Sequence, residues 1–165
     1  MVKTQYPPEP HILKWLQNFA LPTDVVLDVG SGDRRYQNIG AAQVFSLDSW
    51  AKAKPDYLLD LNDSDLPLDR EFDIILLLDV LEHLDKHRSL EILGQAVRLA
   101  QRAVVSLTPM KWDDNRTCFE DTQGFYYQNE NILHRSLWTY DEFDESWARV
   151  ILPSTRECFF GYRLR

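Results

Sequence analysis

The chain has 165 residues, of which 44% are hydrophobic and 27% charged, a composition typical of one globular domain with a sizeable core. Eighteen Lys and Arg residues stand against 26 Asp and Glu residues, and the net charge of −8 disfavours nucleic acid and anionic membranes as partners. No apolar run approaches the roughly 18–20 residues of a membrane span, no signal-peptide pattern is visible, and two cysteines suit a reducing compartment. The sequence therefore predicts a cytoplasmic protein.

The N-terminal part predicts an extended lead-in, a helix and a buried strand. Residues 6–10 are rich in proline, which disfavours helix. Apolar side chains then recur at helical spacing up to Pro22: Ile12, Leu13, Leu16, Phe19 and Ala20. Residues 25–29 are apolar except for Asp28 and end in Gly30-Ser31-Gly32, the pattern of a buried strand that meets a glycine turn.

Four further apolar runs predict strands. Residues 44–47 end at Asp48, residues 57–59 at Asp60, residues 72–78 at Asp79, and residues 103–107 at Thr108-Pro109. Between the last two runs, apolar residues at helical spacing predict a helix with one stripe, Leu90, Leu93, Val97 and Ala100, widened by Ile92, Ala96 and Leu99.

The pattern changes after residue 110. A polar, aromatic-rich stretch comes first, then a predicted helix near residues 139–146, and then two β-like runs over 148–152 and 157–164. The short link between these two runs permits only antiparallel pairing.

Continuous apolar strands interleaved with helices predict an α/β fold, a doubly wound Rossmann-like, mostly parallel sheet with an antiparallel C-terminal strand and helices on both faces. We expect one domain over residues 1–165. It comprises an N-terminal helix region (1–23), a cofactor-binding core (24–110), a substrate-cover segment (111–138) and a closing helix and hairpin (139–165). Ligands of such sheets bind outside the carboxyl ends of the strands, where the polar strand ends converge.

The glycine turn alone is a weak signal. A dinucleotide-binding fingerprint would place a third glycine at position 35, where Arg35 stands, so an oxidoreductase that uses NAD is disfavoured. Asp48, sixteen residues after Gly32, is positioned to accept hydrogen bonds from two ribose hydroxyls. A structural alternative stays open for Asp28, Asp48 and Asp60, which are also ordinary strand-end or turn carboxylates bonded to backbone amides.

Three motifs together are more specific. The run V-L-D-V-G-S-G, the acidic end of the next strand, and F-D-I-I-L-L-L-D-V-L-E-H-L resemble class I S-adenosylmethionine-dependent methyltransferases, and within them the small, single-domain, ubiquinone-methyltransferase-like branch. The resemblance covers about residues 24–110, and the C-terminal hairpin agrees with the antiparallel seventh strand of that family. It implies that S-adenosyl-L-methionine is the cofactor and that its contacts include Asp28, Gly30, Ser31, Gly32, Asp48, Ser49, Asp60, Leu61 and Asp79.

Transfer of a methyl group to a hydroxyl requires positioning and a base with a pKa near neutrality, for which histidine is suited. His83, after the fourth strand, and His134, in the cover segment, are the candidates, although either is equally compatible with a structural role. A metal site of Asp79, His83 and His87 is disfavoured against a solvated helix face, so we expect no metal.

The aromatic-rich segment predicts the acceptor site. Its candidate contacts are Arg116, Tyr126, Tyr127 and Trp138, with packing of a long loop onto the sheet as the alternative. The leading hypothesis is a methyltransferase that acts on a small molecule, at oxygen rather than nitrogen. The alternative is a catalytically degenerate module that binds the cofactor or a protein. Nucleic acid and membranes are not expected as partners, and the oligomeric state is left open.

Overall fold

The computed structural model describes residues 8–165, which form a seven-stranded sheet with the order β3-β2-β1-β4-β5-β7-β6. The strands are β1 (Val25–Val29), β2 (Gln43–Asp48), β3 (Tyr57–Leu58), β4 (Phe72–Leu78), β5 (Ala100–Pro109), β6 (Ala148–Arg149) and β7 (Cys158–Leu164). The first five strands pair in parallel, whereas β7 runs antiparallel to β5 and to β6. The predicted fold class is confirmed.

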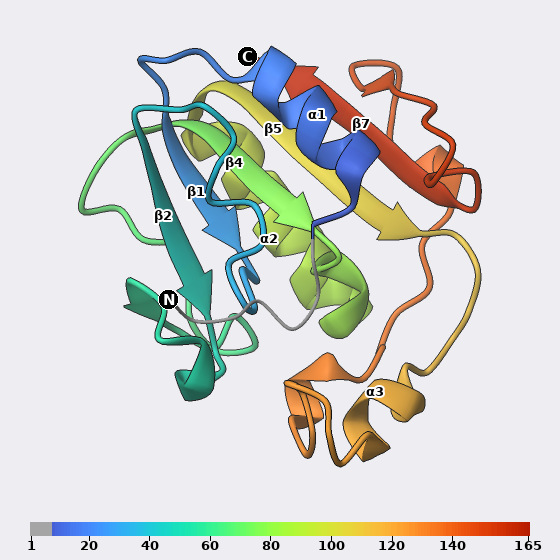
Figure 1. The fold of residues 1–165 in the computed structure, drawn as a ribbon. Helices are drawn as coiled ribbons and strands as arrows, with labels where there is room; N and C mark the ends of the chain where they lie inside the picture. Colours follow the sequence, from blue (N-terminus) through green and yellow to red (C-terminus); the bar gives the residue numbers. More distant parts are fainter. Residues whose placement is uncertain (1–7) are drawn as a thin grey trace.

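The strand order creates a switch point between β1 and β4. From β1 the chain moves outward to β2 and β3 and then returns to β4, so Val29 at the end of β1 lies between Leu47 and Leu77. In Figure 1 the arrowheads of β1, β2, β4 and β5 point to the same edge of the sheet, near the segment that carries α3. The strand ends thus converge at one edge, as the sequence predicts.

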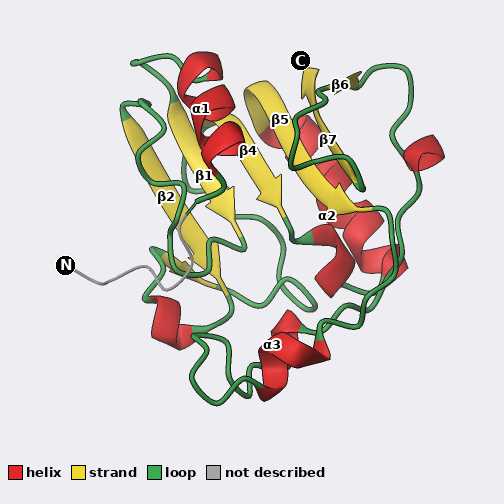
Figure 2. Ribbon diagram, turned by 45° about the vertical axis from the view of Figure 1, so that its right-hand side comes forward, coloured by secondary structure: helices red, strands yellow, loops and turns green. Residues whose placement is uncertain are grey.

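The described helices are α1 (Pro10–Phe19), α2 (Lys86–Leu99) and α3 (Arg116–Glu120), with short 3-10 helices η1 (Ala51–Ala53), η2 (Leu81–His83), η3 (Glu130–Ile132) and η4 (Tyr140–Glu142). Figure 2 shows α1 in front of the sheet and α2 behind it. Each helix closes its own core: Ile12 and Leu16 of α1 pack with Val26 and Leu76, whereas Ile92 of α2 packs on the opposite face. Each fully buried side chain of this kind contributes about 1.5–3 kcal/mol to stability.

No helix among residues 8–165 is both long and apolar enough to cross a bilayer.

Helix α1 ends before Pro22, as its sequence predicts, but it begins at Pro10, inside the predicted extended lead-in. The Glu9 carboxylate accepts a hydrogen bond from the Ile12 amide at 2.7 Å, and Pro10 occupies the first turn, where its missing N–H is not needed. The helix ends at Phe19, before Pro22. Tyr6 and Pro7 of the predicted lead-in lie outside the described residues.

Two local predictions were wrong. Thr139–Ser146 contains only the three-residue η4, because the Asp144 carboxylate accepts a hydrogen bond from the Ser146 amide at 2.9 Å and turns the chain. In the predicted apolar stripe of α2, only Leu90 is misplaced: it is exposed, and Ser89 is buried instead, whereas Leu93 and Ala100 are buried as predicted. The link between β1 and β2, residues 30–42, forms turns and contains no helix.

Candidate active site

The glycine turn brings bare backbone between the ends of β1 and β4. Gly30 and Gly32 have φ angles of +64° and +49°, in the left-handed region that favours glycine. A Cβ atom at Gly30 would lie 2.6 Å from Val80 Cγ2, and one at Gly32 would collide with the Tyr126 hydroxyl. The turn therefore requires glycine at both positions and lets a neighbouring group approach the main chain closely.

The carboxylate of Asp48 is tied to this turn. Its Oδ2 accepts a hydrogen bond from the Gly32 amide at 2.8 Å, and its Oδ1 accepts one from the Trp50 amide at 2.7 Å. Burial raises the pKa of Asp48, and these backbone bonds counteract the rise. Because each carboxylate oxygen has two lone-pair sites, Asp48 retains capacity for two more donors, as vicinal hydroxyls would supply.

A cavity of about 630 Å³ opens at this edge of the sheet, within the range of small-molecule and cofactor sites. The glycine turn, the ends of β2, β3 and β4, and the cover segment all contribute to its wall. Every one of the nine residues predicted to contact the cofactor lines it: Asp28, Gly30, Ser31, Gly32, Asp48, Ser49, Asp60, Leu61 and Asp79. Their convergence follows from the parallel strand order.

Carboxyl groups around the cavity are held in an environment that disfavours their charge. Asp28 is 2% exposed, and burial raises its pKa to about 7, with Asp48 adding to the rise and Arg35 opposing it. Asp79 opens toward the cavity, yet the surrounding protein displaces water and raises its pKa to about 6. Burial, and then the charge of Asp79, raise the pKa of Glu82 well above its ordinary value. The cavity is therefore suited to a ligand that carries positive charge.

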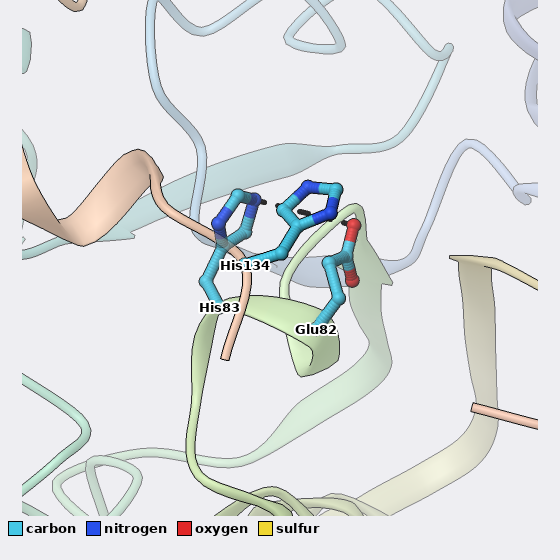
Figure 3. A group of neighbouring side chains, drawn as sticks. All are labelled: Glu82, His83 and His134. Carbon is cyan, nitrogen blue, oxygen red and sulfur yellow. Dashed lines mark ion pairs between the residues drawn. The ribbon is translucent and has the colours of Figure 1, made fainter. Parts of the chain in front are cut away.

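Two histidines contact each other in the cavity wall. His83 lies on η2 after β4, and His134 comes from the cover segment; their ring centroids are 4.8 Å apart and the planes are inclined by 73° (Figure 3). Burial lowers the pKa of His83 to about 4, with His134 as a further cause, and burial also lowers the pKa of His134. Both imidazoles are thus neutral at pH 7.

Backbone hydrogen bonds bring His134 to this place. The amides of Arg135 and Ser136 both donate to the carbonyl oxygen of Glu82, at 2.7 and 3.1 Å. On the other side of the cavity, the Asn131 side chain donates to the Ser49 hydroxyl at 2.8 Å. The cover segment is therefore attached to the ends of both β2 and β4.

The predicted acceptor contacts are only partly placed at the cavity. Tyr126 lines it, and Arg35 Nη2 lies 3.4 Å from the Tyr126 hydroxyl. Trp138 does not: its side chain is 0% exposed and packs in the core against Phe143, with Lys86 Nζ 3.9 Å from its ring centre. The prediction for Trp138 is corrected, because a residue enclosed by the core has no surface left for a ligand.

Arg116 and Tyr127 also lie away from the cavity wall. The Arg116 side chain is 58% exposed and pairs with Asp114 and Glu120, while the Tyr127 hydroxyl accepts a hydrogen bond from Gln128. Both predicted contacts are therefore corrected. His87 is 90% exposed and pairs with Glu91, so Asp79, His83 and His87 do not assemble a site, in agreement with the solvated helix face.

Among the wall residues that sequence reasoning missed, two are charged and lie beside the predicted carboxylates and histidines. Arg35 entered only as the residue that breaks a glycine fingerprint, whereas it lines the cavity beside Asp28 and Asp79. Glu82 is part of the D-V-L-E-H run but was not predicted as a site residue, although it is 2% exposed and lines the cavity. The sequence did contain a signal that could have identified Glu82, because it is an acidic residue directly before a candidate histidine.

Comparisons with known proteins agree at the level of the fold. No protein-family model matches the sequence, and no curated protein matches it significantly. Among solved structures, magnesium protoporphyrin IX methyltransferase (ChlM) from Synechocystis PCC 6803 with bound SAM superposes with a TM-score of 0.62 at 16% identity, covering 94% of this chain and 77% of that one. The N-methyltransferase NodS from Bradyrhizobium japonicum WM9 gives 0.57 at 11% identity, with coverages of 94% and 95%.

An O-methyltransferase family protein from Burkholderia thailandensis gives a TM-score of 0.56 at 14% identity, with 94% of this chain and 55% of that chain covered. At such identities the similarity establishes the fold alone, a Rossmann-like α/β fold that the chain shares with these methyltransferases.

Proposed function

We propose that this chain is an S-adenosylmethionine-dependent methyltransferase that modifies a small-molecule acceptor, at oxygen rather than nitrogen. The observation that carries the proposal is one cavity that joins a bare glycine turn and the Asp48 carboxylate to a pair of neutral histidines. The D-V-L-E-H run after β4 supports placement in the ubiquinone-methyltransferase-like branch.

The cofactor would lie across the ends of β1, β2 and β4. Asp48 would accept hydrogen bonds from the ribose hydroxyls, Gly30 and Gly32 would adjoin the methionine part, and Asp60 with Leu61 and Ser49 would border the nucleoside. S-adenosylmethionine carries a sulfonium and an ammonium group, so carboxyl groups with raised pKa values, such as Asp28 and Asp79, would gain favourable charge partners when it binds.

The acceptor would enter between the cofactor and the histidine pair. In the transfer step the S–CH₃ bond breaks, a bond from the acceptor oxygen to the methyl carbon forms, and S-adenosylhomocysteine leaves. The hydroxyl proton needs an acceptor, and the imidazole of His134 in the wall is the candidate base. His83 is a weak base because its pKa is about 4, and it would help to position His134, whose ring it contacts. Tyr126, which reaches the glycine turn, would help to hold the acceptor.

Replacement of Asp48 tests the cofactor site. We expect Asp48→Ala to weaken S-adenosylmethionine binding by roughly 1.5–3 kcal/mol, because hydrogen bonds to a charged group are lost. Isothermal titration calorimetry measures the change, with NAD as a second ligand that should not bind. Asp141→Ala, on the exposed η4, is the matched control and should bind as the original protein does. Unchanged affinity in folded Asp48→Ala protein would contradict the assignment.

Replacement of His134 tests the acceptor end. We expect His134→Ala to slow turnover by roughly 100-fold, the usual contribution of a positioned base, while the cofactor affinity changes little. Formation of S-adenosylhomocysteine is measured with a panel of phenols and hydroxy acids, alongside calorimetry. Equal losses of turnover and cofactor binding would indicate a folding role, and cofactor binding without turnover on any acceptor would favour the degenerate module.

A further inference from the structure

We propose that Glu82, His83 and His134 bind a divalent first-row transition-metal ion in the wall of the cavity. The location rests on the geometry of these three side chains alone. Only the catalytic role given to the ion below rests on the proposed function.

The three side chains converge from two distant parts of the chain. Glu82 and His83 lie on η2, and His134 is delivered by the cover segment; their ligand atoms all lie within 4.8 Å of one another (Figure 3). Atoms bound about 2.0–2.2 Å from one ion lie up to roughly 4 Å apart, so small side-chain rotations would close the site. The arrangement is the 2-His-1-carboxylate set that binds divalent metals with positions left open.

The orientation of His83 leaves a nitrogen ready to bind a metal. Its Nδ1 lies 3.3 Å from the carbonyl oxygen of Leu133. A carbonyl only accepts hydrogen bonds, so Nδ1 carries the proton and Nε2 carries a lone pair. That Nε2 lies 4.0 Å from Glu82 Oε1. A cation between them would bond to both atoms, and the Leu133 carbonyl would orient the ring.

The second carboxylate oxygen of Glu82 is an independent indication. Glu82 is 2% exposed, its Oε2 is buried, and this atom has no hydrogen-bond partner among the described residues. A buried, unpaired carboxylate is destabilising, so a native protein keeps one where a ligand or a proton satisfies it. Asp79, whose charge acts on Glu82, also lines the cavity.

The donor set favours particular ions. Two imidazoles and one carboxylate suit Zn²⁺, Fe²⁺, Co²⁺ or Mn²⁺, whereas Mg²⁺ and Ca²⁺ prefer oxygen ligands. All three residues line the cavity, so the open coordination positions would be available to an acceptor hydroxyl. There the ion would lower the pKa of the hydroxyl and help to orient it toward the methyl group, favouring acceptors with two adjacent oxygens. With the ion bound, the lone pairs of His83 and His134 are ligands, so activation of the hydroxyl would fall to the ion and no longer to an imidazole base.

Metal binding is tested on tag-free protein that has been stripped with EDTA. We expect one Co²⁺ per chain by equilibrium dialysis, with visible d–d absorption bands that Zn²⁺ displaces. Affinity should fall by roughly 100-fold or more in His83→Ala, His134→Ala and Glu82→Gln, since loss of a ligand exceeds the effect of losing an outer-shell partner. His87→Ala, which alters an exposed histidine on α2, is the matched control and should bind Co²⁺ normally.

Circular dichroism and thermal melting verify that each variant folds. If the alanine variants do not fold, Glu82→Gln, which keeps the shape of the side chain, provides the test. Absence of Co²⁺ binding, or equal binding in His134→Ala and the original protein, overturns the site. Co²⁺ binding without any affinity for S-adenosylmethionine would leave the metal site standing and refute the proposed function; the converse result would refute only the metal site.

Discussion

A Trp138→Ala protein should be less stable than the original by about 3–5 kcal/mol in free energy of unfolding. The Trp138 ring is fully buried, packs 5.4 Å from the Phe143 ring, and lies beneath the ammonium group of Lys86. Its removal leaves a cavity that the surrounding core cannot fill, which for large aromatic residues has costs of about this size. Urea denaturation, followed by circular dichroism, measures the change.

Trp112→Ala is the matched comparison. Trp112 is 52% exposed on the cavity wall, so its removal should change stability by no more than about 0.5 kcal/mol. If Trp138→Ala were as mild as Trp112→Ala and impaired acceptor binding instead, the original prediction of Trp138 as an acceptor contact would be reinstated.

The pH dependence of stability should change when Asp28 is replaced by Asn. The folded state raises the pKa of Asp28 from 3.8 to about 7, so the folded protein holds a proton that the unfolded chain releases between these values. Stability from this group is therefore complete below pH 4 and is lost as the pH rises to about 7. The shift corresponds to roughly 4 kcal/mol, which Asp28→Asn should remove from the pH profile.

The charged groups that act on Asp28 are Asp33 and Asp48, which raise its pKa, and Arg34 and Arg35, which lower it. The comparison uses urea denaturation of both proteins at pH 4.5 and pH 8 without cofactor, so contributions from all other groups cancel in the difference. Asp63→Asn, at an exposed position, controls for loss of a charge. Parallel pH profiles for Asp28→Asn and the original protein would show that Asp28 ionises normally.

The sheet could be predicted from the sequence because its strands are buried on both faces. Runs such as residues 72–78 are apolar except for Asp73, and a glycine turn or carboxylate marks their ends. The turns after β1 could not be predicted so well. Arg34 adopts a φ angle of +60° there, a backbone conformation that depends on the tertiary contacts of its neighbours. The helix prediction for Thr139–Ser146 was wrong because a local hydrogen bond from the Ser146 amide to the Asp144 carboxylate outweighed helix formation.

The convergence of the strand-end residues on one cavity could be predicted, whereas the placement of the aromatic segment could be predicted only in part. Residues such as Gly32 and Asp48 follow strand ends directly, so their place is a consequence of the sheet. Composition alone cannot separate Tyr126, at the cavity, from Trp138, in the core, because both are aromatic residues of one long segment. Hydrogen bonds to the Glu82 carbonyl determine where that segment lies, and they join residues more than fifty positions apart.

Two successive amides of the glycine turn, those of Ser31 and Gly32, donate to Leu47 and Asp48 at the end of β2. The carboxylate is thus oriented during folding, before any nucleoside arrives. The entropic cost of ordering this side chain is therefore part of the free energy of folding, and it does not reduce the free energy of ligand binding. A ligand that fits this arrangement would meet a rigid receptor, and its residence time would then depend on how readily the cover segment detaches from the sheet edge.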